Sequence, residues 1–442
     1  MAVIGVLAIV IGAVRATRHS LWIDEAATAN FMQRSPKGLL SLLWHEGGMG
    51  PYYIATWFWV RLSASDWWLR MFSVVGGACT LIAVYWLARM LRNRLWSALA
   101  VTLVMIHPQF MANLTNARDY TWVMFGAVLS FILLFRYLET GRRSDLLSYA
   151  AVNGVTLALT VWVAPIVATQ GIWFLVTRRD RAALRGVTLA SLVSLIVVAP
   201  FLHALLTTRS LDWIPRLTWK HFMDESSLFF GGAWWFWFVA VGNAALLALA
   251  SVRRVANHPK SRFVLLSVSA IVTPVAVALA SFVKRSYIAR YMVQAMPLFV
   301  MGALAGFGGV LALVLGARQT RRRAGIAALA VVAVLSVIVF PYRGFGAYGP
   351  DQDLRGAARI LQADQQPGDR YLFVAPWLGW LLGHYWQVPS EAVVTSLDGL
   401  ASGTRVWLVV LNPVPGVVPA NGGRVVSRHS LTNIEVSELL VD

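Results

Sequence analysis

The stretch FVLLSVSAIVTPVAVALASFV, residues 263–283, contains no charged side chain. An α-helix needs about 20 predominantly apolar residues to cross the hydrocarbon core of a bilayer. Similar runs recur along the chain, which has 442 residues, of which 58% are hydrophobic and 13% are charged. Soluble domains carry about 25% charged residues. The composition therefore excludes an ordinary soluble enzyme and a disordered chain, and it predicts an all-α polytopic membrane protein.

Eleven apolar runs are candidate membrane spans, and the charges between them predict their orientation. The runs are residues 1–14, 66–88, 95–111, 119–138, 146–164, 165–177, 187–206, 231–251, 263–283, 290–316 and 324–341. With the N-terminus in the cytosol, the inner loops hold 18 basic residues and three acidic ones. Pro165 could instead kink the fifth and sixth runs into one helix. That merger would place the later arginine clusters outside, against the positive-inside rule, so we expect about eleven spans.

Most of the net charge of +18 follows from this orientation. A strongly basic soluble chain would suggest nucleic-acid binding. Arginine clusters at the inner ends of spans are instead membrane anchors, so we expect membrane lipid and no nucleic acid as a partner. The chain is rich in Ala, Val, Arg and Leu and poor in Lys, which suggests the plasma membrane of a bacterium.

The first predicted outer segment, residues 15–65, is too long to be a simple connector. Ser35-Pro36 is typical of the N-cap and first position of a short helix. Pro51 opens a second short, aromatic-rich helix, which suits the membrane interface better than a span. A second long outer segment follows at residues 207–230.

The last hundred residues change in character. We expect residues 1–341 to form the membrane domain and residues 342–442 to form a small extracytoplasmic α/β domain. The sequence predicts helices at 353–364 and 377–386, a strand at 371–374, a buried strand at 406–411, and edge strands at 424–426 and 434–436.

Three polar clusters fall on the predicted outer face. Asp24 and Glu25 follow the first span, and two adjacent carboxylates at a membrane face are costly to desolvate. Residues 116–120, Asn-Ala-Arg-Asp-Tyr, open the fourth span. Residues 284–291 carry three cations against the positive-inside trend, which indicates an anion such as a lipid phosphate. Each cluster also has a purely structural interpretation. Asp24 and Glu25 could start a helix whose dipole favours acids, residues 116–120 could cap the fourth span, and residues 284–291 could anchor the chain to lipid headgroups.

At these clusters the sequence resembles the GT-C glycosyltransferases, in particular the protein-mannosyltransferase-like group, family 39. Five motifs occur in the family's order over roughly residues 20–300. They are Leu21-Trp22-Ile23-Asp24-Glu25-Ala26, like the first-loop motif; Gly50-Pro51-Tyr52-Tyr53, like P-L-Y-Y; Trp68-Leu69-Arg70-Met71-Phe72-Ser73, like A-L-R-L-P-S; Ala117-Arg118-Asp119-Tyr120, like A-R-x-Y; and Arg290-Tyr291 with Pro297, like R-Y-L-x-P-x-x-P.

The chain departs from the family pattern at three places. Gly48-Met49-Gly50 stands where the family often has His-Pro-Pro before the tyrosine pair, so a histidine-dependent role there is in doubt. Asn116 stands where an acid often precedes A-R-x-Y, which puts a metal site using that acid in doubt. Phe72 replaces the proline of A-L-R-L-P-S.

The resemblance implies a GT-C-like membrane enzyme that transfers a sugar from a polyprenyl-phosphate donor to an acceptor hydroxyl outside the membrane, with inversion. It implies that Asp24 is the general base and that Glu25 orients the acceptor or the base. The donor phosphate would be bound by Arg118, Lys284, Arg285, Arg290 and Tyr291, where Lys284 and Arg285 are chosen on charge alone. Further pocket residues would be Asp119, Tyr120, Tyr52, Tyr53 and Arg70.

The chemistry of the clusters agrees with this expectation. A phosphate is already a good leaving group, so the reaction needs one base and cations on the phosphate. A glycosidase would instead need two carboxylates about 5–9.5 Å apart across one bond. Asp24 and Glu25 are neighbours in sequence and therefore point in different directions.

Several points stay open in the sequence. Many GT-C sites are described as metal-assisted, and Asp24, Glu25 and Asp119 are candidate oxygen ligands for a divalent metal. The sugar could be mannose or arabinose, and the acceptor in the cell envelope could be a glycan, a lipid or a protein. A transporter or flippase of lipid-linked sugar is expected to have ionisable residues inside its spans and two halves related by an internal repeat. Neither feature is visible in this sequence. A non-catalytic scaffold would leave the Asp24-Glu25 and Arg290 clusters without a role.

Overall fold

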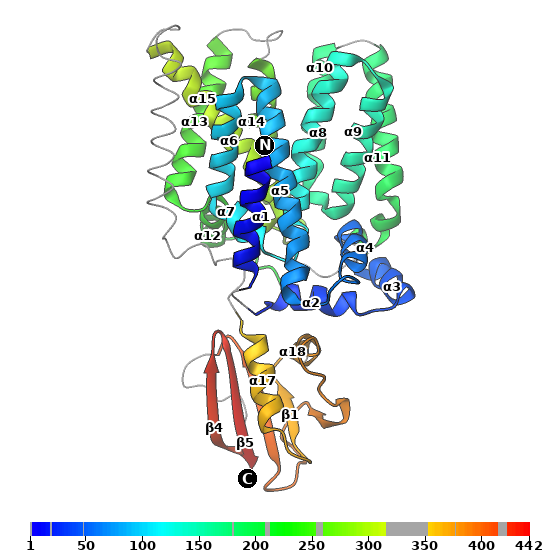
Figure 1. Cartoon of the computed structure of the whole chain (residues 1–442), viewed down its shortest axis with the longest axis vertical. Helices are drawn as coiled ribbons and strands as arrows, with labels where there is room; N and C mark the ends of the chain where they lie inside the picture. The colour runs from blue at the N-terminus through cyan, green and yellow to red at the C-terminus, as the bar shows by residue number, and fades with distance from the viewer. Residues whose placement is uncertain are drawn as a thin grey trace.

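The computed structural model describes residues 2–17, 20–46, 48–178, 181–207, 213–252, 260–314, 352–375, 377–413 and 422–442. It has two parts (Figure 1). Long helices run roughly parallel to one another in a bundle, and a small α/β unit lies at one end of that bundle. Short helices from the first loop lie between the two parts.

The bundle is built from the apolar runs. Its helices are α1 (Ala2–Ala16), α5 (Asp66–Leu91), α6 (Arg94–Ile106), α7 (Pro108–Leu114), α8 (Tyr120–Thr140), α9 (Arg143–Leu159), α10 (Ala164–Arg178), α11 (Arg181–Thr207), α13 (Ala233–Val252), α14 (Lys260–Ala280) and α15 (Met296–Val314). Among the described residues, six helices are long and apolar enough to cross a membrane, or seven if α6 and α7, which meet at a 67° bend, form one span.

The chain is thus a multi-pass membrane protein, but the expected count of eleven spans is not confirmed. The apolar helices at Val3–Ala16 and Val161–Thr177 are shorter than a full span. The last expected span, residues 324–341, and the expected domain boundary at residue 341 lie outside the described residues.

The fifth and sixth apolar runs form two separate helices, as expected. α9 ends at Leu159, and Thr160 has an extended backbone with φ −152° and ψ 130°. Its side chain accepts a hydrogen bond from the backbone N–H of Trp162, which caps the 3₁₀ turn η1 (Val161–Val163). Pro165 therefore lies in the first turn of α10, where a missing N–H leaves no helical bond unmade.

Close helix contacts in the bundle depend on glycine. A Cβ atom added to Gly306 of α15 would lie 1.8 Å from the carbonyl oxygen of Gly242 in α13. Small residues allow membrane helices to approach until their backbones touch. Large apolar side chains such as Ile196 and Leu279 remain exposed on the bundle, as suits a surface that faces lipid.

The first loop forms the short helices that the sequence predicts. They are α2 (Ile23–Met32), α3 (Pro36–Glu46) and α4 (Gly50–Trp59). Ser35 caps α3, because its hydroxyl accepts a hydrogen bond from the backbone N–H of Gly38 at 3.2 Å. In the second outer segment, α12 (Trp219–Phe230) is a further amphipathic helix capped by Thr218. The 3₁₀ turns η2 (Ala289–Tyr291) and η3 (Val293–Ala295) lead into α15.

The C-terminal unit is a mixed sheet with two helices. Its elements are α17 (Leu354–Asp364), β1 (Arg370–Phe373), α18 (Trp377–Leu382), η4 (Ser390–Ala392), β2 (Val393–Val394), β3 (Arg405–Leu411), β4 (Gly423–Leu431) and β5 (Ile434–Val441). The strand order is β2-β1-β3-β5-β4, in which β1 pairs in parallel with β2 and β3 and the remaining pairs are antiparallel.

Two details of this unit differ from the sequence predictions. The second helix ends at Leu382 rather than at 386, and the turn that follows presents His384 and Tyr385 toward the bundle. β5 is not an edge strand, because it lies between β3 and β4 in the sheet.

Candidate active site

A cavity of about 320 Å³ lies at the end of the bundle next to the first-loop helices. Its walls come from α2, the start of α4, the start of α8, the junction of α9 and α10, and the turns before α15. Its charged lining residues are Asp24, Arg118, Asp119 and Arg290. The cavity therefore brings together residues from the first, fourth and fifth of the sequence motifs, and Tyr53 of the second motif also lines it.

Asp24 occupies the first turn of α2 and forms an ion pair across the cavity. One carboxylate oxygen, Oδ2, accepts a hydrogen bond from Nη1 of Arg290 at 2.7 Å. The face of Trp213 covers the Arg290 guanidinium at 4.8 Å. Burial disfavours the charged form of Arg290, but Tyr120 and Asp24 raise its pKa above the usual value. Arg290 is therefore a permanent cation beside Asp24.

Arg118 supplies the second cation of the cavity. Its Nη1 donates to the hydroxyl of Tyr53 at 3.0 Å and lies 3.4 Å from Oγ1 of Thr28. Its Nε is buried and has no hydrogen-bond partner among the described residues. The guanidinium therefore keeps a free donor next to the cavity.

Asp119 is 3% exposed and lies beside Arg118 at the start of α8. Burial raises the pKa of its carboxyl to about 7, although Arg118 and Arg290 oppose the shift. Its side chain makes no capping hydrogen bond to α8, so helix capping does not account for this acid. Asn116 does not cap the helix either: its Oδ1 accepts from the indole N–H of Trp22 at 3.2 Å.

Glu25 points away from the cavity and forms a buried ion pair with Arg70. Nε and Nη2 of Arg70 donate to the two carboxylate oxygens at 3.0 and 2.6 Å, with side-chain exposures of 6% and 2%. The same carboxylate accepts from the backbone N–H groups of Ala117 at 2.8 Å and Trp22 at 3.3 Å. Glu25 therefore ties the first loop to α5 and to the segment that carries Arg118 and Asp119.

Arg70 extends this network toward the first span. It donates to the backbone carbonyls of Ala16 at 3.1 Å and Ser20 at 2.8 Å. Neither Glu25 nor Arg70 lines the cavity. Both act on the site through the backbone that they hold.

The remaining expected site residues divide into two groups. Tyr53, Tyr120 and Tyr291 line the cavity, and Tyr291 stacks on Trp162 with ring centroids 5.5 Å apart. Tyr52 is buried but is not part of the lining. Lys284 and Arg285 do not line the cavity either, and Arg285 is exposed. Phosphate binding by Lys284 and Arg285 stays a prediction from charge.

Sequence reasoning missed Trp162, Trp213 and Gln294, which also line the cavity. Trp162 lies near the end of the fifth apolar run, just before the break at Pro165, and a break on the predicted outer face was a usable signal. Trp213 lies in a long outer segment without a motif, and Gln294 lies in an apolar run. The contacts that bring these two residues to the cavity have no pattern in the sequence.

The residues present give limited support for a resident metal. No group of three or more His, Cys, Asp or Glu side chains that could hold an ion occurs among the residues that the structure describes. Of the three candidate ligands, Glu25 is occupied by Arg70 and two backbone N–H groups. Asp24 and Asp119 could offer two oxygen ligands in the cavity, with an arginine next to each. We therefore assign no step to a metal.

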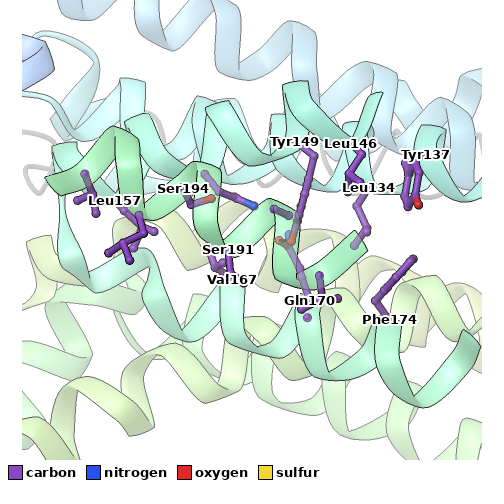
Figure 2. Close-up of a pocket in the computed structure, with 16 residues that line it drawn as sticks. Leu134, Tyr137, Leu146, Tyr149, Leu157, Val167, Gln170, Phe174, Ser191 and Ser194 are labelled. Carbon is purple, nitrogen blue, oxygen red and sulfur yellow. Dashed lines mark hydrogen bonds between the residues drawn. The ribbon is translucent and has the colours of Figure 1, made fainter. Parts of the chain in front are cut away.

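A second cavity, of about 250 Å³, lies inside the bundle between α8, α9, α10 and α11 (Figure 2). Its lining is mostly apolar and contains no charged residue. Two of its polar members are held by hydrogen bonds: Tyr149 donates to Gln170 at 2.9 Å, and Gln170 donates to Ser130 at 2.8 Å. This cavity offers no counter-charge for a phosphate.

Comparison with known proteins supports a glycosyltransferase fold. Residues 46–203, just over a third of the chain, match the family described as dolichyl-phosphate-mannose-protein mannosyltransferase. A search of curated proteins finds no match.

Four solved structures, of three different proteins, share the fold. ArnT from Cupriavidus metallidurans in the apo state has a TM-score of 0.66 at 14% identity, covering 99% of this chain and 97% of that one. The structure of the same protein bound to undecaprenyl phosphate has a TM-score of 0.64 at 15% identity. The arabinofuranosyltransferase AftD from Mycobacteria gives 0.56 at 14%, with 100% of this chain matching 40% of that one. The oligosaccharyltransferase of Archaeoglobus fulgidus, in complex with Zn and sulfate, has a TM-score of 0.55 at 12% identity, covering 86% of this chain and 61% of that one.

Two of these proteins are named as an arabinofuranosyltransferase and an oligosaccharyltransferase, and ArnT has been solved with undecaprenyl phosphate bound. The GT-C resemblance and the fold class expected from the motifs are therefore confirmed: a membrane helix bundle with a small C-terminal α/β unit.

The Glu25–Arg70 pair yields a prediction on stability. Removing one partner of a buried ion pair leaves the other charge uncompensated and costs about 3–5 kcal/mol. We expect Glu25→Gln to lower the thermal unfolding temperature of the purified protein in detergent, and Glu25→Gln/Arg70→Met to recover part of the loss. Asp224→Asn is the control, because Asp224 forms an exposed pair with Lys220. A Glu25→Gln protein as stable as the control would show that the pair does not hold the first loop.

Proposed function

We propose that this protein transfers a sugar from a polyprenyl-phosphate donor to an acceptor hydroxyl in the cavity that holds Asp24. The observation that carries the proposal is the convergence of one carboxylate, Asp24, with two arginines, Arg118 and Arg290, in a single polar cavity. The fold adds support, because ArnT shares it over nearly the whole chain and has been solved with undecaprenyl phosphate bound.

The proposed reaction needs only the groups that the cavity contains. Asp24 takes the proton of the acceptor hydroxyl while the hydroxyl oxygen attacks the anomeric carbon of the sugar. The bond from that carbon to the phosphate oxygen breaks, and its electron pair leaves with the polyprenyl phosphate. The attack from the opposite face inverts the anomeric carbon. Arg118 and Arg290 stabilise the negative charge that develops on the phosphate. The leaving phosphate therefore needs no proton from an acid.

Arg290 links donor binding to activation of the base. Its guanidinium bonds to Oδ2 of Asp24 at 2.7 Å. A bound donor phosphate would compete for the same guanidinium and weaken its hold on the carboxylate. Donor binding would thus make the Asp24 carboxylate a better acceptor for the proton of the attacking hydroxyl.

The cavity is proposed to face the extracytoplasmic side. Along α5, Arg70 lies near the cavity, and Arg89 lies 19 residues further on, about 30 Å away at 1.5 Å per residue. Arg142 and Arg178 likewise stand at the ends of α8 and α10 that are remote from the cavity. Because arginine-rich ends stay in the cytosol, the cavity and the α/β unit would lie outside, in a bacterial plasma membrane.

The sugar and acceptor are proposed as classes. The family matched by residues 46–203 is described by mannose transfer, and AftD is an arabinofuranosyltransferase. We therefore propose a hexose such as mannose, or a pentose such as arabinose, transferred to an envelope glycan, lipid or protein.

The base is tested by Asp24→Asn in membranes supplied with radiolabelled polyprenyl-phosphate mannose or arabinose. General-base catalysis contributes roughly 10²–10⁴-fold, so we expect kcat to fall at least 100-fold while donor binding is retained. Asp224→Asn, an exposed acid on α12, is the matched control and should transfer normally. Undiminished transfer by Asp24→Asn would remove the proposed base. Passage of label across the membrane without transfer would favour a flippase.

Asp119 yields a prediction on pH. Because burial raises its pKa to about 7, Asp119 is neutral at pH 6 and ionised at pH 8. The donor is a phosphodiester with one constant negative charge over this range. The ionised Asp119 carboxylate and the donor phosphate should repel each other by about 1 kcal/mol when partly screened. This repulsion should raise the donor KM roughly 3–10-fold from pH 6 to pH 8. The donor KM of Asp119→Asn should not change with pH over this range. An equal rise of KM in that variant would show that Asp119 does not cause the pH dependence.

A further inference from the structure

The backbone just before Asp24 is held by the α/β unit. The N–H of Leu21 donates to the hydroxyl of Tyr385 at 2.9 Å. The N–H of Ile23, the first residue of α2, donates to Oε1 of Gln352 at 3.3 Å. Between them, the N–H of Trp22 donates to Glu25. Three successive amides before Asp24 are thus fixed, two of them by residues more than 300 positions away in sequence.

Tyr385 is itself held in place by the bundle. Its hydroxyl donates to Oδ2 of Asp66, at the start of α5, at 2.6 Å. Asp66 also accepts from Nη2 of Arg355 at 2.5 Å and from Nε2 of His384 at 2.8 Å. Burial and the Asp66 carboxylate raise the pKa of Tyr385, so its hydroxyl stays protonated. The tyrosine therefore bridges α5 and the backbone that enters α2.

Further contacts fix α2 at both ends. At its start, Oγ of Ser20 accepts from the backbone N–H of Arg355 at 3.0 Å. Near its end, the amide of Asn30 donates to the carbonyl of Trp380 at 2.7 Å. Leu21 is fully buried in an apolar cluster that includes Leu381 of α18. In Figure 1, α2 lies between the bundle and the unit that contains α17 and α18.

The sequence of α2 explains why it needs this support. The helix has ten residues, and its N-cap residue Trp22 makes no side-chain capping bond. Helices this short are marginal alone, and their first N–H groups require acceptors from elsewhere. Gln352 supplies an acceptor to Ile23, the first N–H of α2, and Tyr385 holds the backbone just before the N-cap. Both contacts therefore restrain the first turn of α2, which carries Asp24.

We propose that the C-terminal α/β unit positions the catalytic carboxylate, with Tyr385 and Gln352 as positioning residues that set the place of Asp24 in the cavity. This inference rests on the proposed function, in which Asp24 is the base. A misplacement of 1 Å in a catalytic group can cost about 10²-fold in rate. The unit would thus contribute to kcat without touching either substrate.

Two variants of the full-length protein test the proposal, each assayed with radiolabelled polyprenyl-phosphate sugar. Tyr385→Phe keeps the ring and removes the hydroxyl, and Gln352→Leu removes the acceptor for Ile23. We expect each to lower kcat about 10-fold, short of the full cost of 1 Å of misplacement, with the donor KM within twofold of wild type. Gln352→Glu, which retains an acceptor oxygen, should recover most of the loss. Tyr371→Phe is the matched control, because Tyr371 is a buried tyrosine of the same unit that packs on Trp386.

The same substitutions on an Asp24→Asn background separate positioning from general damage. If Tyr385 acts through Asp24, Tyr385→Phe should cause no further loss once the base is gone. A wild-type kcat in both single variants, a change confined to KM, an equal loss in Tyr371→Phe, or a full additional loss on the Asp24→Asn background would each overturn the proposal. Normal transfer by Asp24→Asn alone would instead overturn the proposed function, which makes the two failures distinguishable.

Discussion

The buried ion pair of Glu25 and Arg70 determines where the other charges of the candidate site lie. Each carboxylate oxygen of Glu25 bonds both to Arg70 and to a backbone N–H, so the charge is fully compensated in a place that water does not reach. Because its neighbour Asp24 extends to another side of α2, a fixed Glu25 presents Asp24 to the cavity. The backbone N–H of Ala117 also donates to Glu25, so the same carboxylate helps to position Arg118 and Asp119, which follow Ala117 in the chain.

The cavity then combines opposite charges. In the proposed reaction, Arg118 and Arg290 bind the donor phosphate and Asp24 takes the proton of the attacking hydroxyl. One base would be sufficient, because the proposed leaving group is already an anion of low basicity. The α/β unit completes the arrangement from outside the cavity, since Tyr385 and Gln352 hold the backbone on which Asp24 lies. The proposed catalytic groups, the Glu25–Arg70 anchor and the support from the α/β unit therefore come from five distant parts of the chain.

Composition and motif order were enough to predict the class of fold and the four charged residues of the cavity. Apolar runs of span length have few alternatives in a bilayer, and Asp24, Arg118, Asp119 and Arg290 stand on the predicted outer face in a recognisable order. Charge alone was a weaker guide, since Lys284 and Arg285 lie outside the cavity lining. The partners of Glu25, and the bonds of Tyr385 and Gln352 to backbone amides, follow from tertiary structure. Bonds to a backbone N–H place no constraint on the residue that donates it, so no sequence pattern marks them.

The most direct measurement is an experimental structure of the protein with polyprenyl phosphate bound in a lipid nanodisc. The account predicts that phosphate oxygens lie within hydrogen-bond distance of the guanidinium groups of Arg118 and Arg290, with Asp24 released from Arg290 and still facing the cavity. A phosphate bound at Lys284 and Arg285, or in the apolar cavity between α8 and α11, with the Asp24–Arg290 pair unchanged, would contradict it.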